Sequence, residues 1–123
     1  MTPDLRRIVA VEAHRRRSGR CPVRVHSLGT GETFEIRPAA DGFVDVTTGV
    51  TVRSDGAQIV LPDGPIELTL VGDVFFEGVE RASGEPFSGR AGGGSSVTLY
   101  DRNRNDYFQY AVVGEGDVTQ GLP

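Results

Sequence analysis

Residues 95–113 read Ser-Ser-Val-Thr-Leu-Tyr-Asp-Arg-Asn-Arg-Asn-Asp-Tyr-Phe-Gln-Tyr-Ala-Val-Val, and this stretch decides the class of fold. Two β-prone runs, residues 97–100 and 107–113, flank the polar segment 101–106, which holds turn-forming residues and no apolar side chain. Such an arrangement predicts a β-hairpin with a loop longer than a two-residue turn. We expect the rest of the chain to consist of similar hairpins.

The same pattern occurs at two earlier places in the chain. When three phenylalanines are placed in register, an acid lies two residues before each, and a Gly or Asn precedes each acid. The phenylalanines are Phe34, Phe87 and Phe108, the acids are Glu32, Glu85 and Asp106, and the preceding residues are Gly31, Gly84 and Asn105. The corresponding loop entrances are Ser27, Glu80 and Asp101. Internal repetition and chance similarity between hairpins explain this pattern equally well.

Short alternating apolar runs continue along the chain, separated by turn signals at intervals of about 8 to 12 residues. Thr48-Gly49 is one such turn, and Pro-Asp-Gly-Pro at residues 62–65 is another. We predict an all-β fold, a sandwich or barrel of about nine short antiparallel strands built from hairpins and preceded by one N-terminal helix. The continuous apolar piece at residues 74–76 suggests burial on both faces or a bulge. Gly78 and Pro86 indicate an edge position for residues 78–89.

The N-terminal residues predict a helix over residues 3–17. Residues 2–4, Thr-Pro-Asp, have the order of an N-cap, a first-turn proline and a first-turn acid, and Gly19 is a plausible stop. Apolar side chains then recur at helical spacing, namely Leu5, Ile8, Val9 and Ala13. The β-branched residues within 8–11 leave a strand as the alternative.

Charge is divided unequally along the chain. Residues 1–24 hold seven Arg and two acids, or +5, and the rest holds six Arg and fifteen acids, or −9, which together give the net charge of −4. We therefore expect a basic N-terminal helix or arm (1–20), a single β domain (21–113) and a polar C-terminal tail (114–123). The arm has three possible uses: to dock on an acidic surface of its own or another chain, to bind nucleic acid, or to be solvated. Docking is favoured, because burial of the apolar stripe stabilises the docked helix.

Composition excludes several kinds of chemistry. All 13 basic residues are Arg, so a Walker A loop and Schiff-base catalysis are excluded, and this bias is typical of a GC-rich genome, here expected to be bacterial. Cys21 is the single cysteine, which rules out an intrachain disulfide and, with two histidines, a structural zinc cluster. A Cys21–His26 pair is less favoured than a packed, inert thiol. We expect no catalytic residue, no cofactor and no metal.

The segment 101–105 matches the first three ligand positions of an EF-hand calcium loop, but Asp106 and Val112 stand where Gly and Glu are required. An EF-hand is therefore excluded. The sequence also lacks an apolar run of the roughly 20 residues that a membrane span needs. We expect a cytoplasmic protein without membrane contact.

The main functional hypothesis is a non-enzymatic β-domain that binds another protein or assembles with its own copies as a homo-oligomer. The expected contact residues are Tyr100, Arg102, Arg104, Tyr107 and Tyr110, because Tyr and Arg are favoured at interface centres. Tyr107 and Tyr110 could instead cover the core.

Two alternatives come from other classes of function. The first is a domain that binds or hydrolyses a small molecule or carbohydrate with loop carboxylates at Glu32, Glu85 and Asp106. These acids could equally close their loops through hydrogen bonds to backbone N–H groups, which is the favoured interpretation. The second alternative is nucleic-acid binding through the Arg-rich N-terminus, which the acidic net charge disfavours.

Overall fold

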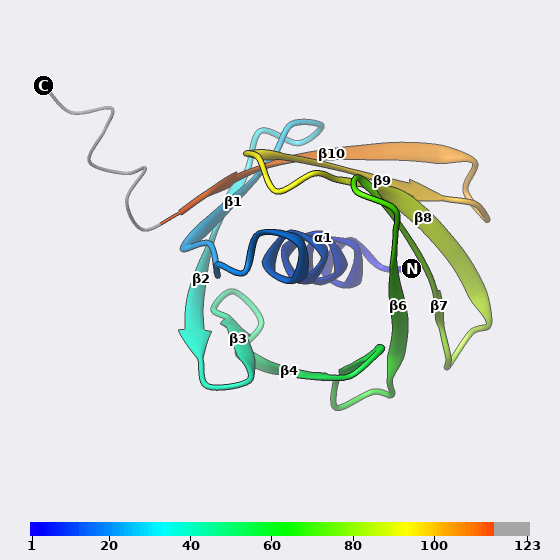
Figure 1. Ribbon diagram of the computed structural model, residues 1–123, viewed down its shortest axis with the longest axis horizontal. Helices are drawn as coiled ribbons and strands as arrows, with labels where there is room; N and C mark the ends of the chain where they lie inside the picture. Colours follow the sequence, from blue (N-terminus) through cyan, green and yellow to red (C-terminus); the bar gives the residue numbers. More distant parts are fainter. Residues whose placement is uncertain (115–123) are drawn as a thin grey trace, which may run out of the picture.

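Helix α1 (Pro3–Ser18) runs through the centre of a closed antiparallel β-barrel, as Figure 1 shows for this computed structural model. The structure describes residues 1–114, and within them the helix is followed by ten strands. These are β1 (Arg24–Ser27), β2 (Thr33–Ala39), β3 (Gly42–Asp45), β4 (Val50–Asp55), β5 (Gln58–Val60), β6 (Ile66–Val71), β7 (Phe75–Glu80), β8 (Glu85–Ala91), β9 (Ser96–Asp101) and β10 (Asp106–Val113).

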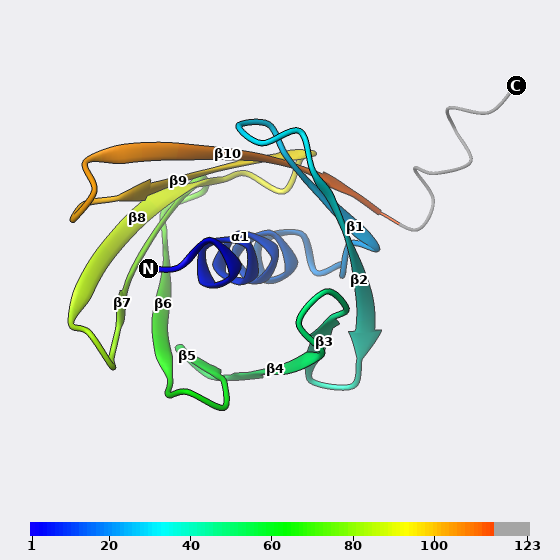
Figure 2. The same cartoon turned by 180° about the vertical axis from the view of Figure 1, so that it is seen from behind.

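Each strand pairs with the next along the chain, and β10 returns to pair with β1, so the sheet closes. Figure 2 shows the same ring of strands from behind. The predicted all-β class with an N-terminal helix is confirmed, and the architecture is the barrel. The predicted edge position of residues 78–89 is wrong, because β7 and β8 have a hydrogen-bonded neighbour on each side.

The glycines of β7 and β8 make room for two aromatic rings. Gly78 lies opposite Phe87, and Phe76 lies opposite Gly89. A Cβ atom added at Gly78 would lie 2.4 Å from the Phe87 ring, and one added at Gly89 would lie 2.3 Å from the Phe76 ring. The two buried rings thus lie across glycine backbone, 6.4 Å apart between centroids.

Helix α1 begins and ends as the sequence predicts. The Thr2 hydroxyl accepts a hydrogen bond from the Leu5 amide at 3.2 Å, and Gly19 adopts a left-handed conformation with its N–H on the Arg15 carbonyl. The helix prediction is confirmed to within one residue, and the strand alternative is wrong. The middle of the helix is buried on every side, which is typical of a helix enclosed by its own protein.

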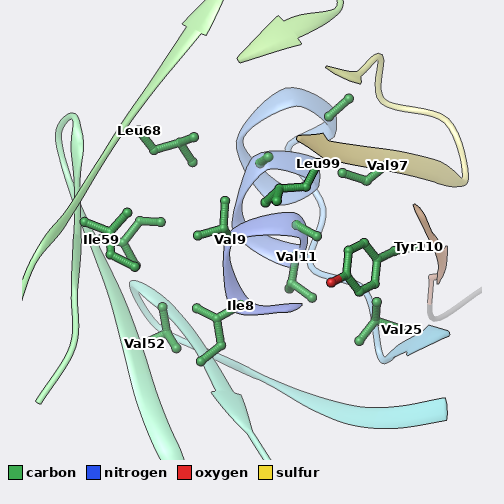
Figure 3. Packing of buried hydrophobic residues seen from close by; sticks show 14 of the residues in the cluster. Ile8, Val9, Val11, Val25, Val52, Ile59, Leu68, Val97, Leu99 and Tyr110 are labelled. Atoms are coloured by element: carbon green, nitrogen blue, oxygen red, sulfur yellow. The ribbon is translucent and has the colours of Figure 1, made fainter. Parts of the chain in front are cut away.

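Apolar side chains of α1 form the centre of the core. Figure 3 shows Ile8, Val9 and Val11 pointing from the helix towards different parts of the barrel wall. The surrounding wall residues in that view include Val25, Val52, Ile59, Leu68, Val97, Leu99 and Tyr110. Helix and barrel therefore share one hydrophobic core.

Arginines at the end of α1 are bound by the barrel. Arg16 donates to the carbonyls of Gln58 and Leu68 at 2.8 and 3.0 Å. Arg17 donates to three further carbonyls, those of Ala91, Gly72 and Phe75. Arg15 and Arg16 also bind the fully buried Glu12, each at 2.8 Å. The basic helix is thus docked within its own chain, and much of its charge lies inside the molecule.

Residues 74–76 differ from their prediction. Phe76 is buried, but Phe75 is 52% exposed and Val74 lies in the turn before β7, so ordinary strand alternation replaces burial on both faces. No helix within residues 1–114 has the length and apolar character that crossing a membrane requires. Of the predicted polar tail, Gly114 is described and residues 115–123 lie outside the described residues.

Candidate functional site

A cleft of about 620 Å³ opens at the end of the barrel where α1 begins. Three parts of the chain line it: residues 27–32 with Phe34, residues 106–110, and Pro3, Arg6 and Arg7 of the helix. Helix α1 occupies the centre of the ring of strands (Figure 1). The side chains of its middle part are buried there, so the cleft borders a packed core. Its walls combine aromatic rings with charged and polar groups.

Four of the hairpin loops at this end contain a residue with a left-handed backbone near their end. Gly49, Gly84 and Asn105 each close a four-residue hairpin loop, with a φ of +74°, +74° and +53°, and Gly31 has a φ of +75° in the five-residue loop between β1 and β2. A left-handed backbone favours Gly or Asn, which explains the pattern found in the sequence. The hairpin at residues 45–50 is a further copy that the sequence comparison missed, because Val50 stands where the other copies have an acid.

Arg7 is held by carboxylates. Its Nε and Nη2 donate to Asp45 at 3.0 and 2.7 Å, and its Nη1 lies 2.9 Å from Asp4. The Phe34 ring lies 4.0 Å from the guanidinium, and Thr48 donates to Asp45 at 2.6 Å. Burial alone would raise the pKa of Asp45, but hydrogen bonds from Arg7 and Thr48 outweigh it and hold this pKa below its usual value. Every nitrogen of Arg7 therefore has a partner.

Arg6 has weaker partners. Its side chain is buried, its Nη1 donates to the Met1 carbonyl at 2.7 Å, and the Phe108 ring lies 3.9 Å from its guanidinium. The nearest carboxylate oxygen, Asp101 Oδ2, is 3.7 Å from Nη1 and 3.6 Å from the Met1 amino group. Arg6 Nε has no hydrogen-bond partner among residues 1–114.

Tyr110 lies inside the barrel beside Arg6. Burial raises the pKa of its phenol, and the adjacent charge and hydrogen bond of Arg6 oppose this rise in part. The hydroxyl therefore stays protonated at neutral pH and can donate a hydrogen bond. Of the expected contact residues, Tyr110 is thus placed in the core and in the cleft wall.

The other expected contact residues lie outside. Tyr100 and Tyr107 stack on the outer wall with ring centroids 4.7 Å apart, and Tyr107 also reaches the cleft. Arg102 and Arg104 are exposed in the loop 101–106. The structure therefore separates this predicted set between the wall, a loop and the core.

The structure brings two of the three predicted carboxylates together. Glu32 and Asp106 line the cleft, whereas Glu85 pairs with the amino group of Met1. A hydrogen bond from that amino group lowers the pKa of Glu85. Asp106 also accepts a hydrogen bond from the Tyr107 amide at 2.9 Å. A hydrogen bond to a backbone N–H is the structural alternative that the sequence offered for these acids.

The remaining sequence candidates lie elsewhere. The Cys21 thiol contacts the Pro22 carbonyl, and burial raises the pKa of this thiol. The His26 ring is paired with the Thr33 hydroxyl at 2.8 Å. Across the part of the chain that the structure describes, no three His, Cys, Asp or Glu side chains are grouped to hold a metal ion.

Sequence reasoning missed Arg6 and Arg7 as site residues. It treated them as members of a basic arm, although they directly precede the apolar run of residues 8–11. That position, directly before four consecutive apolar residues at 8–11, was the available signal for burial. The chain matches no family of known proteins, no curated protein and no solved structure.

Proposed function

We propose that the protein is a non-enzymatic binding protein that takes up a small organic molecule in the cleft at the open end of its barrel. The observation that carries this proposal is a cleft of about 620 Å³ with aromatic walls and polar groups at one place. Cavities of roughly 300 to 1,000 Å³ with mostly apolar walls and a few polar groups are typical ligand sites.

Apolar surface in the cleft supplies the driving force. Phe34 and Phe108 are half-buried there, and Leu28 is 54% exposed beside them. A ligand that covers these side chains removes apolar surface from water, which contributes about 25 cal/mol for each Å². The rigid barrel and its central helix hold both rings in place, so little order has to be imposed on binding.

Binding is favoured over hydrolysis by the setting of the carboxylates. Acid–base hydrolysis by a carboxyl pair needs one group in an apolar environment, where it keeps its proton. Glu32 and Asp106 are both exposed at the rim of the cleft. They suit recognition of a polar ligand group better than proton transfer.

The test uses the neutral fluorophore N-phenyl-1-naphthylamine, which brightens in apolar surroundings. Gly29 lines the cleft, and a Cβ added there meets no atom within 4 Å; the same holds for Gly94 in the β8–β9 loop. We expect saturable binding to the unmodified protein, at least tenfold weaker binding to Gly29→Phe, and unchanged binding to Gly94→Phe. Absence of saturable binding, or equal loss in both variants, would refute the proposal.

Self-association is a second candidate, and exposed apolar side chains on the outer wall favour it. Val71, Phe75 and Tyr107 are 43%, 52% and 67% exposed and line one hollow of about 380 Å³. Arg90 and Glu77 line the same hollow, so a second copy turned by a two-fold axis could pair unlike charges across the contact.

Sedimentation at high protein concentration tests this second candidate. We expect a dimer that Phe75→Ser converts to monomer and that Val46→Ser leaves intact, because Val46 is exposed but does not line the hollow. If the unmodified protein sediments as a monodisperse monomer, self-association is refuted.

Nucleic-acid binding, a cytoplasmic location and a bacterial source stay predictions. The arginines of α1 donate to barrel carbonyls and carboxylates, so nucleic-acid binding through them would require the helix to leave the barrel. Salt-dependent retention on heparin would support that possibility.

A further inference from the structure

We infer that the ligand of the cleft is an organic monocarboxylic acid whose carboxylate is bound by Arg6. This inference rests on the proposed function, and it goes further by naming the chemical class of the ligand and the residue that selects it. Two observations carry it. Arg7 has a partner for every nitrogen whereas Arg6 has an unpartnered Nε, and the rim of the cleft carries negative charges.

Arg6 has an unused donor in a buried position. The residue is 7% exposed and lines the cleft, and its Nε has no hydrogen-bond partner within the described chain of residues 1–114. A buried donor without an acceptor costs about 1 to 3 kcal/mol, and more when the group is charged. Nε itself has almost no accessible surface, so a carboxylate that enters from the cleft reaches it only when the guanidinium shifts towards the opening. The bond then formed removes that cost, and the planar guanidinium matches the geometry of a carboxylate.

Arg7 cannot take this role. Its three nitrogens are engaged by Asp45 and Asp4, at 2.7 to 3.0 Å. The nearest acid to Arg6 is Asp101, whose Oδ2 lies 3.7 Å away and is shared with the Met1 amino group at 3.6 Å. Neither contact reaches hydrogen-bond distance, and the hydrogen bonds of Arg6 go to the Met1 carbonyl and to Tyr110, so its Nε–H is the donor left for an incoming anion.

The surroundings of Arg6 describe the rest of the ligand. The Phe108 ring holds the guanidinium at 3.9 Å, and Phe34 lies against Arg7 at 4.0 Å. These rings and Leu28 form apolar walls, so the part of the acid away from its carboxylate is apolar. The Tyr110 hydroxyl, beside Arg6, supplies a second donor for the carboxylate.

The rim limits the ligand to one negative charge. Glu32 and Asp106 are exposed at the edge of the same cleft, and each would repel a second acidic group on a ligand whose first carboxylate is bound by Arg6. Dicarboxylates and phosphate esters carry that second charge. The site therefore selects a single carboxylate on an apolar body.

Calorimetric titration with 2-naphthoate and its neutral isostere 2-naphthamide tests the inference. We expect the unmodified protein to bind the acid at least tenfold more tightly than the amide. Arg6→Met keeps an apolar stem against Phe108 and should abolish this preference. Arg90→Met removes an arginine that lies over another ring, Phe75, on the outer wall, and should keep the preference.

Nuclear magnetic resonance keeps the test decisive if Arg6→Met fails to fold. In the unmodified protein, the Nε–H signal of Arg6 should shift on addition of naphthoate and stay in place with naphthamide. Equal binding of both probes, or an acid preference that survives in Arg6→Met, would overturn the inference while leaving the proposed function intact. Failure of naphthoate, naphthamide and N-phenyl-1-naphthylamine to bind would overturn both.

Discussion

The buried pair of Arg7 and Asp45 should be a main anchor of the helix within the barrel, and Asp45→Ala tests this. Arg7 is 3% exposed, and the substitution leaves it with the exposed Asp4 as its carboxylate partner. Removing one partner of a buried ion pair costs about 3 to 5 kcal/mol, because the remaining charge is uncompensated. For a chain of this length, about 4 °C for each kcal/mol converts that cost to a fall of about 12 to 20 °C in Tm.

Urea unfolding followed by circular dichroism measures this cost. The control is Glu35→Ala, which removes the 3.2 Å ion pair between Arg24 and the 61% exposed side chain of Glu35. Exposed pairs contribute about 0 to 1 kcal/mol, so we expect a small effect. The double substitution Arg7→Met with Asp45→Leu should recover most of the lost stability, since apolar side chains of similar size can replace a buried pair. If Asp45→Ala cost no more than Glu35→Ala, the reasoning about a buried anchor would be wrong.

Three further predictions concern packing and pH. Gly89→Ala should cost more than about 2 kcal/mol, because its Cβ would lie 2.2 Å from a backbone oxygen of β9 and 2.3 Å from the Phe76 ring, whereas Gly94→Ala in open space should be close to neutral in the same unfolding assay. The lowered pKa of Asp45 means that its stabilisation is complete above the unfolded value of about 3.9 and is lost as pH falls through the folded value; Asp45→Ala should therefore show a flatter acid limb of stability against pH. The raised pKa of Tyr110 has the opposite sign, so stability should fall as pH rises above about 10, and Tyr110→Phe should flatten that alkaline limb.

Local chemistry made much of the fold predictable. The hairpin of β9 and β10 follows from polar loop residues between alternating apolar runs, and the helix ends follow from Thr2 and Gly19, whose effects act within a few residues. The closed ring is less accessible to sequence reasoning, because it depends on pairing between residues as distant as Arg24 and Val113. Gly78 resembled an edge signal for the same reason, since the ring that covers it comes from another strand.

The site was harder to predict than the fold. The arginines of α1 were predicted to lie on a surface. Their partners include the backbone carbonyls of Gln58 and Leu68, and no pattern of side chains in the sequence reveals such partners. Asp101 and Asp106 are the same residue type at the two ends of one loop, yet the first is buried and the second exposed. That difference depends on the direction in which each strand residue points, which the residue type does not reveal. The sequence therefore indicated the acids as site residues and did not indicate Arg6.

The enclosure of α1 has a consequence for the order of folding. The helix leaves the ribosome before the strands that enclose it, and the seam between β1 and β10 joins only after residue 113 has been made. A 16-residue helix is marginally stable in water on its own, and until the barrel closes it lacks the packing that stabilises it. We expect its arginines to keep this nascent segment soluble until the wall surrounds them and barrel carbonyls replace water as their partners. Sealing by such distant segments also predicts slow, late acquisition of the native state.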